Sequence, residues 1–217
     1  MTEQLDLKAL ERRAWRSTYE DGLTDIFLGL LLSQFGLGLW LAPKFGEMGT
    51  LGVMFVYACA LVVGLGVAKK RITRPRAGTA RFGTERKVKQ KKVAVVLSLS
   101  MLVGAVLFAV AIAGWVSLAG WILPASVFGI NAIVVFGLLA YLNDVPRFAL
   151  YGWLFAGAFP AWVLIDEIAG RQFRPIAPFA FSLVMVVTGV VMLVKFVRRY
   201  DAAQADSLSR AMSHDGQ

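Results

Sequence analysis

Long uncharged apolar segments, separated by short charged ones, constrain the fold of this chain more than any other feature. Six segments of 18 to 22 residues contain no charged side chain: 26–43, 49–68, 93–114, 121–142, 148–165 and 175–194. A helix needs ~20 apolar residues to cross the hydrocarbon core of a bilayer. Because lipid offers no partner to unpaired backbone groups, such segments must be helical. We therefore predict an all-α, polytopic integral membrane protein with six transmembrane helices.

Composition agrees with this class and removes several kinds of chemistry. The chain is 58% hydrophobic and 17% charged, whereas soluble domains are about 45–50% apolar and about 25% charged. Its one cysteine, Cys59, cannot form an intrachain disulfide, and its one histidine, His214, lies in a polar tail. Neither a zinc site nor a Ser-His-Asp triad can be built from this set. We expect no metal and no cofactor, and a non-enzymatic protein is favoured.

Positive charge is strongly asymmetric between the two sets of connecting segments. Of the 23 Lys and Arg residues, 20 fall in the N-terminal segment, the 69–92 loop, the 143–147 loop and the C-terminal tail. The three on the other set are Lys44, Arg171 and Arg174. Because Lys and Arg accumulate on the cytoplasmic side, we predict that both termini are cytoplasmic. The expected location is a bacterial-type inner (plasma) membrane, with multiple passes.

These patterns divide the chain into three parts. Residues 1–24 form a cytoplasmic N-terminal segment that could lie on the membrane as an amphipathic helix. Residues 25–199 form a single six-helix membrane domain with the basic loop 69–92. Residues 200–217 are polar, and we predict a short helical extension followed by disorder.

The basic loop is the first candidate for function. It holds eleven Lys or Arg residues and one acid, Glu85. Next to a membrane, anionic lipid headgroups are the nearest ligands for such a charge cluster. An acidic protein partner is the alternative ligand, and nucleic acid is disfavoured. The side chains predicted to bind are Arg71, Arg74, Arg76, Arg81, Arg86 and Lys87.

Two other functions stay open. A small oligomeric transporter or channel would use a polar path near Gln34, Tyr57, Asn131 and Asp166. Amides in hydrocarbon need hydrogen-bond partners, so bonding between helices also explains Gln34 and Asn131. The third function is a lipid-headgroup-modifying enzyme that uses Arg74, Arg76 and Arg81 on a phosphate.

Local patterns predict where helices start and touch. Gly22 can end a preceding helix, Thr24 can cap the first span, and Asp25 then lies at the positive end of the helix dipole. This favours a structural role for Asp25. Small residues four apart predict close helix contacts at Gly29/Ser33, Ala60/Gly64, Ser100/Gly104 and Gly152/Ala156.

Overall fold

The computed structural model describes residues 19–73, 75, 84–112 and 122–214, and in these residues it is all-helical. The helices are α2 (Leu23–Ala68), the π-helical turn η1 (Lys69–Thr73), α4 (Thr84–Ile112), α5 (Ile122–Asn143), α6 (Arg147–Ala169), the short η3 (Arg171–Phe173) and α7 (Ile176–His214). The all-α prediction is confirmed for this part of the chain. The expected interfacial helix at the N-terminus lies largely outside the described residues.

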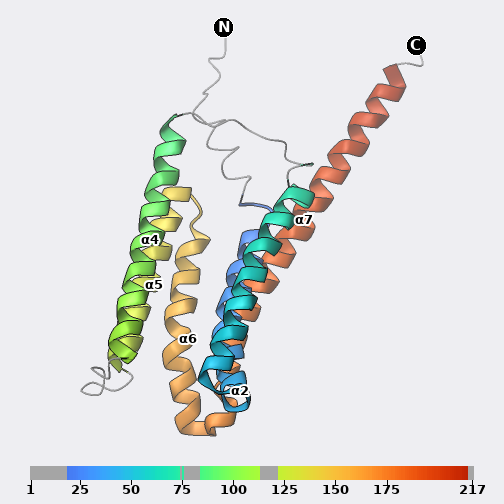
Figure 1. Ribbon diagram of the computed structural model, residues 1–217. Helices are drawn as coiled ribbons and strands as arrows, with labels where there is room; N and C mark the ends of the chain where they lie inside the picture. The colour runs from blue at the N-terminus through green and yellow to red at the C-terminus, as the bar shows by residue number, and fades with distance from the viewer. Residues whose placement is uncertain (1–18, 74, 76–83, 113–121, 215–217) are drawn as a thin grey trace.

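Helix α2 consists of two limbs that fold back on each other at Gly46. This residue has φ 68° and ψ 177°, a backbone conformation that side chains with a Cβ avoid. The first limb (residues 23–45) and the second limb (residues 47–68) run side by side, as Figure 1 shows in blue and teal. Gln34 Nε2 donates to the Met54 carbonyl at 3.1 Å, and this bond joins the two limbs. The break falls in the polar interval between the predicted segments 26–43 and 49–68.

The helices form two packed groups. The limbs of α2 pack mainly against α7, and α5 packs mainly against α6, with α4 beside α5 (Figure 1). Helices α6 and α7 also contact each other and connect the groups. The buried core includes Leu32, Phe136, Phe148, Phe155 and Met185.

Close backbone approach explains the α2–α7 pairing. A Cβ added to Gly189 on α7 would lie 2.7 Å from the backbone nitrogen of Ile26. Ser182 Oγ donates to the Gly29 carbonyl at 2.7 Å, from α7 to α2. Gly152 of α6 similarly packs against the Cβ of Phe136. The predicted contacts at Gly29 and Gly152 are therefore confirmed.

The other two predicted pairs make no close contact at their glycines, although Ser100 of the Ser100/Gly104 pair meets α5 through the hydrogen bond that it accepts from Asn131. An added Cβ at Gly64 or at Gly104 would meet nothing within 4 Å, so neither glycine lies at a helix contact. Small spacing alone does not select a contact face, because a glycine can equally well face outward.

Four helices in the described part are long and apolar enough to cross a membrane. They are Leu23–Thr73, Ser126–Asn143, Arg147–Ala169 and Arg171–Asp201, and the first contains the fold-back at Gly46. Large apolar side chains face outward over these helices, including Phe55, Val56, Trp153 and Ile168. A soluble monomer rarely exposes so much contiguous apolar surface. Length and composition are thus compatible with a membrane protein.

The C-terminal part of the chain differs from the prediction. Helix α7 continues to His214, so the tail is helical over most of the stretch predicted to be disordered. Residues 202–212 hold alanine, glutamine, arginine, leucine and methionine, which are strong helix formers, and no glycine or proline. The helix can therefore extend beyond the apolar segment.

Candidate functional site

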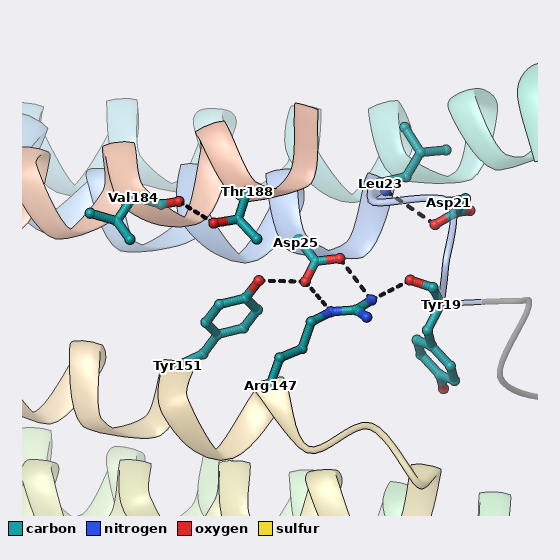
Figure 2. A network of polar contacts seen from close by, with 8 residues as sticks. All are labelled: Tyr19, Asp21, Leu23, Asp25, Arg147, Tyr151, Val184 and Thr188. Carbon is teal, nitrogen blue, oxygen red and sulfur yellow. Dashed lines mark hydrogen bonds and ion pairs between the residues drawn. The ribbon is translucent and has the colours of Figure 1, made fainter. Parts of the chain in front are cut away.

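A buried ion pair joins the start of α2 to the start of α6. Asp25 has no exposed surface. Arg147 Nε donates to Asp25 Oδ1 at 2.7 Å, and Arg147 Nη2 donates to Asp25 Oδ2 at 3.0 Å. Tyr151 lies one turn further along α6 and donates its hydroxyl to Asp25 Oδ1 at 2.5 Å. Figure 2 shows both side chains reaching from α6 to the carboxylate on α2.

Tyr19 extends this network to the α5–α6 connection. Its carbonyl accepts a hydrogen bond from Arg147 Nη2, and its hydroxyl donates to Asn143 Oδ1 at 3.0 Å. Its ring meets the ring of Phe148 edge to face, with 5.6 Å between centroids. Burial raises the pKa of Tyr19 above its ordinary value because the phenolate would be desolvated. We call Tyr19, Asp25, Asn143, Arg147 and Tyr151 the polar latch.

A second acid next to the latch fixes the chain before α2. Asp21 Oδ1 accepts from the backbone N–H of Leu23 at 3.1 Å, and Asp21 Oδ2 accepts from Thr73 Oγ1 at 2.7 Å. The cap residue is Gly22, with φ 69°, and it makes no side-chain cap. The predicted cap at Thr24 is wrong: its buried hydroxyl has no hydrogen-bond partner. Asp21 thus provides an acceptor for a backbone N–H at the start of α2 and links this start to η1.

The geometry of the polar latch favours a structural role over a catalytic one. The carboxylate of Asp25 accepts three bonds from groups that are themselves packed against neighbouring helices. A general base needs a lone pair within reach of substrate, whereas Asp25 is fully covered. No group of three or more His, Cys, Asp or Glu side chains able to hold a metal occurs in the described part of the chain.

A cavity of about 610 Å³ lies between the two groups of helices. This volume falls in the ~300–1,000 Å³ range of small-molecule sites. Its walls are apolar and aromatic, and four polar side chains face it, two from α2 and one each from α4 and α5. The lining includes Gln34, Gly38, Thr50, Met54, Ser100, Phe128, Asn131, Phe136, Phe155 and Trp162.

The amides in this cavity keep acceptor capacity. Gln34 uses its NH₂ group on the Met54 carbonyl, and Asn131 uses its NH₂ group on Ser100 Oγ at 3.0 Å. No hydrogen bond in the described residues ends on the amide oxygen of Gln34 or of Asn131. Each oxygen can accept two hydrogen bonds. A ligand that carries a hydroxyl or N–H donor would therefore find acceptors here.

The structure brings together only part of the predicted polar path. Gln34 and Asn131 line the cavity, whereas Tyr57 and Asp166 do not. Tyr57 bonds Ser33 Oγ at 3.0 Å and stabilises the α2 fold-back instead. Asp166 forms an ion pair with Arg174 across the α6–α7 turn. Both residues therefore have roles in joining helices.

The predicted cationic site is described only in part. Arg71 is exposed in η1. Arg86 and Lys87 belong to the first turn of α4, and nothing is described of their side chains. Arg74, Arg76 and Arg81 lie outside the described residues.

Sequence reasoning missed the polar latch as a unit. The local pattern explains Asp25 by the helix dipole alone and places Arg147 among the charges of the 143–147 loop. Both flank apolar segments at ends predicted to share one side of the membrane, and that signal could have paired them. Ionisable residues at span ends that face a bundle usually find such partners.

Comparison with protein-family models, with curated proteins and with solved structures finds no match to this chain.

Proposed function

We propose that this chain is a six-span, non-enzymatic membrane protein that binds a lipid-like molecule in the cavity between its two helix groups. The cavity is the observation that carries this proposal, because it combines apolar walls with unused acceptors on Gln34 and Asn131. An amphipathic molecule satisfies both features. Its chain fills the apolar volume, and its hydroxyl or amide donates to the acceptors.

Helix lengths support six crossings. The limbs of α2 on either side of Gly46 hold 23 and 22 residues. At 1.5 Å per residue each spans about 33 Å, enough for a hydrocarbon core of about 30 Å. Helix α4 has 29 residues, the last 20 of them uncharged. With α5, α6 and α7 this makes six segments.

The charge distribution supports one orientation. The start of α2, the start of α4, the α5–α6 connection and the later part of α7 lie at one end of the bundle (Figure 1). The cationic residues of the described helices at that end include Lys69, Lys70, Arg71, Lys91, Lys92, Arg147, Lys195, Arg198 and Arg199. We propose that this end is cytoplasmic and that the basic loop 69–92 engages anionic lipid or an acidic partner there.

Cysteine labelling tests the orientation. In a Cys59→Ser background, Arg71→Cys and Glu47→Cys place single thiols at exposed positions at opposite ends of the bundle. A membrane-impermeant maleimide applied to intact cells should label position 47 and spare position 71 until the membrane is opened. Labelling of position 71 from outside would refute the orientation.

A matched pair of glycine substitutions tests lipid binding in the cavity. Gly38 lines the cavity, and a Cβ added there meets only Met54 Sδ at 3.8 Å, so Gly38→Leu should fill the space without a backbone clash. Gly64 lies on the same helix, outside the cavity, with nothing within 4 Å of an added Cβ. Native mass spectrometry of the detergent-extracted chain should show a retained lipid that Gly38→Leu loses and Gly64→Leu keeps. Equal retention in both variants would refute the cavity as the binding site.

A transporter is the second candidate, favoured by Gln34 and Asn131 facing one cavity that the latch does not reach. In a transporter, the polar latch would close the solute path at its own end of the helix interface. Proteoliposomes that move solute should then lose flux in Gln34→Leu and Asn131→Leu and keep it in Thr188→Val, whose hydroxyl bonds its own helix at Val184. Flux unchanged in both cavity variants would exclude this path.

A further inference from the structure

A small charged pocket lies beside the start of α2 and the later part of α7, apart from the central cavity. Its volume is about 180 Å³, and it is lined by Glu20, Met192, Lys195, Phe196, Arg199 and Tyr200. Lys195 and Arg199 are one helical turn apart, so their side chains project from the same face of α7. Glu20 contributes the carboxylate.

The three charged groups of this pocket do not satisfy one another. Within the described part of the chain, Glu20, Lys195 and Arg199 make no ion pair or hydrogen bond with one another, although all three line one small volume. Like charges one turn apart on a helix repel each other. An anion bound between Lys195 and Arg199 would remove this repulsion. The carboxylate of Glu20 would attract a cationic group next to that anion.

The apolar lining places the pocket at the edge of the membrane. The rings of Phe196 and Tyr200 pack with 4.7 Å between centroids, and Met192 adds an apolar wall. The uncharged apolar part of α7 ends at Val194, directly before Lys195 and less than two turns before Tyr200. Tyrosine favours the level of the lipid headgroups because its ring is apolar and its hydroxyl is polar.

We infer that this pocket binds a phospholipid headgroup that carries a primary amine, of the phosphoethanolamine class. Lys195 and Arg199 hold the phosphate, which arginine can contact with two N–H groups. Glu20 holds the ammonium group. The acyl chains run along the exposed valines of α7, including Val187, Val191 and Val194. The inference rests on the membrane placement in the proposed function but not on the central cavity.

Native mass spectrometry of the full chain, delipidated and then titrated with single lipids, tests this inference. Phosphatidylethanolamine should bind about tenfold more tightly than phosphatidylcholine, a difference of 1.4 kcal/mol, because choline has no N–H to donate to Glu20. The double variant Lys195→Gln/Arg199→Gln should lose about tenfold in affinity for phosphatidylethanolamine and for phosphatidylglycerol. Glu20→Gln should lose the preference for ethanolamine over choline and still bind phosphatidylglycerol. These residues are exposed, so the variants should fold, and their melting temperatures check this.

Controls separate this pocket from other sources of binding. Arg171→Gln removes an exposed arginine at the other end of the bundle and should change no affinity. Glycerophosphoethanolamine, the headgroup without acyl chains, should compete weakly if a lipid is the ligand and fully if a free phosphate compound is. Equal affinity for ethanolamine and choline lipids, or Glu20→Gln without effect, overturns the inference. Lipid loss in Gly38→Leu concerns the central cavity and leaves this test intact.

Discussion

Breaking the Asp25–Arg147 pair should destabilise the protein more than any other single change in the described polar contacts. Asp25 is fully buried, while the Arg147 side chain keeps 24% of its surface exposed. Removing one partner of a buried ion pair costs about 3–5 kcal/mol because the other charge stays desolvated. Arg147→Met leaves a buried carboxylate with Tyr151 as its remaining donor, so it should cost near the upper value. Asp25→Asn leaves a partly hydrated arginine that keeps the Tyr19 carbonyl, so it should cost near the lower value.

A double-mutant cycle separates the pair from its surroundings. The cycle consists of Asp25→Leu, Arg147→Met and the variant that carries both, and the double variant should lose less stability than the sum of the losses in these two single variants. We expect a coupling energy of about 2–3 kcal/mol, at the upper end for residues in one network. Tyr151→Phe removes one bond to a charged acceptor and should cost about 1.5–3 kcal/mol. Thr188→Val is the control, since its hydroxyl bonds its own helix.

Reversible unfolding in detergent micelles, followed by tryptophan fluorescence, measures these differences. A coupling energy below about 0.5 kcal/mol would refute the reasoning, because contacting residues in a network couple by at least that amount. The reasoning would also be refuted if Arg147→Met lowered the free energy of unfolding less than Asp25→Asn does. Such a result would mean that water reaches Asp25 and that the carboxylate is not desolvated.

Three further predictions concern the helix contacts and the latch. Gly189→Leu should separate α7 from α2 and lower the melting temperature sharply, because its Cβ would lie 2.7 Å from the Ile26 nitrogen. Gly104→Leu is the control and should have little effect, since nothing lies within 4 Å of its Cβ. Equal melting temperatures of the two variants would contradict this packing. Gly46→Ala should cost about 1–3 kcal/mol, because φ 68° with ψ 177° is a conformation that is almost restricted to glycine, and stability equal to that of the unmodified chain would contradict the fold-back. The raised pKa of Tyr19 means that the folded chain disfavours the phenolate, so stability should be constant below the ordinary tyrosine value of 10.0 and fall at higher pH. Tyr19→Phe should reduce this alkaline loss in urea titrations at pH 8 to 11, and an unchanged profile would assign the loss to other groups.

Much of the helical architecture could be predicted from the sequence because it depends on local solvation. An uncharged apolar segment must satisfy its own backbone, so its helical state follows from composition. The break at Gly46 could be predicted for the same reason, since Lys44 and Glu47 interrupt the apolar segments there. The helical tail to His214 could not, because polarity alone does not distinguish a solvated helix from disorder.

The candidate site depends on partners that lie far apart in the chain, and composition does not specify them. Asp25 and Arg147 are separated by 122 residues, and they become neighbours only because α2 and α6 both pack against α7. The amides were easier to find, because Gln34 and Asn131 are rare polar groups in apolar segments. Whether such an amide lines a cavity or joins two helices is decided by side-chain direction. Gln34 and Asn131 do both, whereas Tyr57 only joins the α2 limbs.

The latch and the cavity are linked through α6. Arg147, Tyr151 and Phe155 follow one another at single-turn spacing on one face; the first two bind Asp25, and Phe155 lines the cavity. The latch therefore fixes the separation of the two helix groups at one end, while the apolar cavity lies further along the same interface. If the ion pair sets that separation, Asp25→Asn should alter lipid retention in the cavity without touching its lining. A filled cavity should in turn stabilise the latch, because binding to the folded state raises stability in proportion to ligand occupancy. Lipid retention and unfolding free energy should then change together across the latch variants, and independent changes would show that the two ends of the interface act separately.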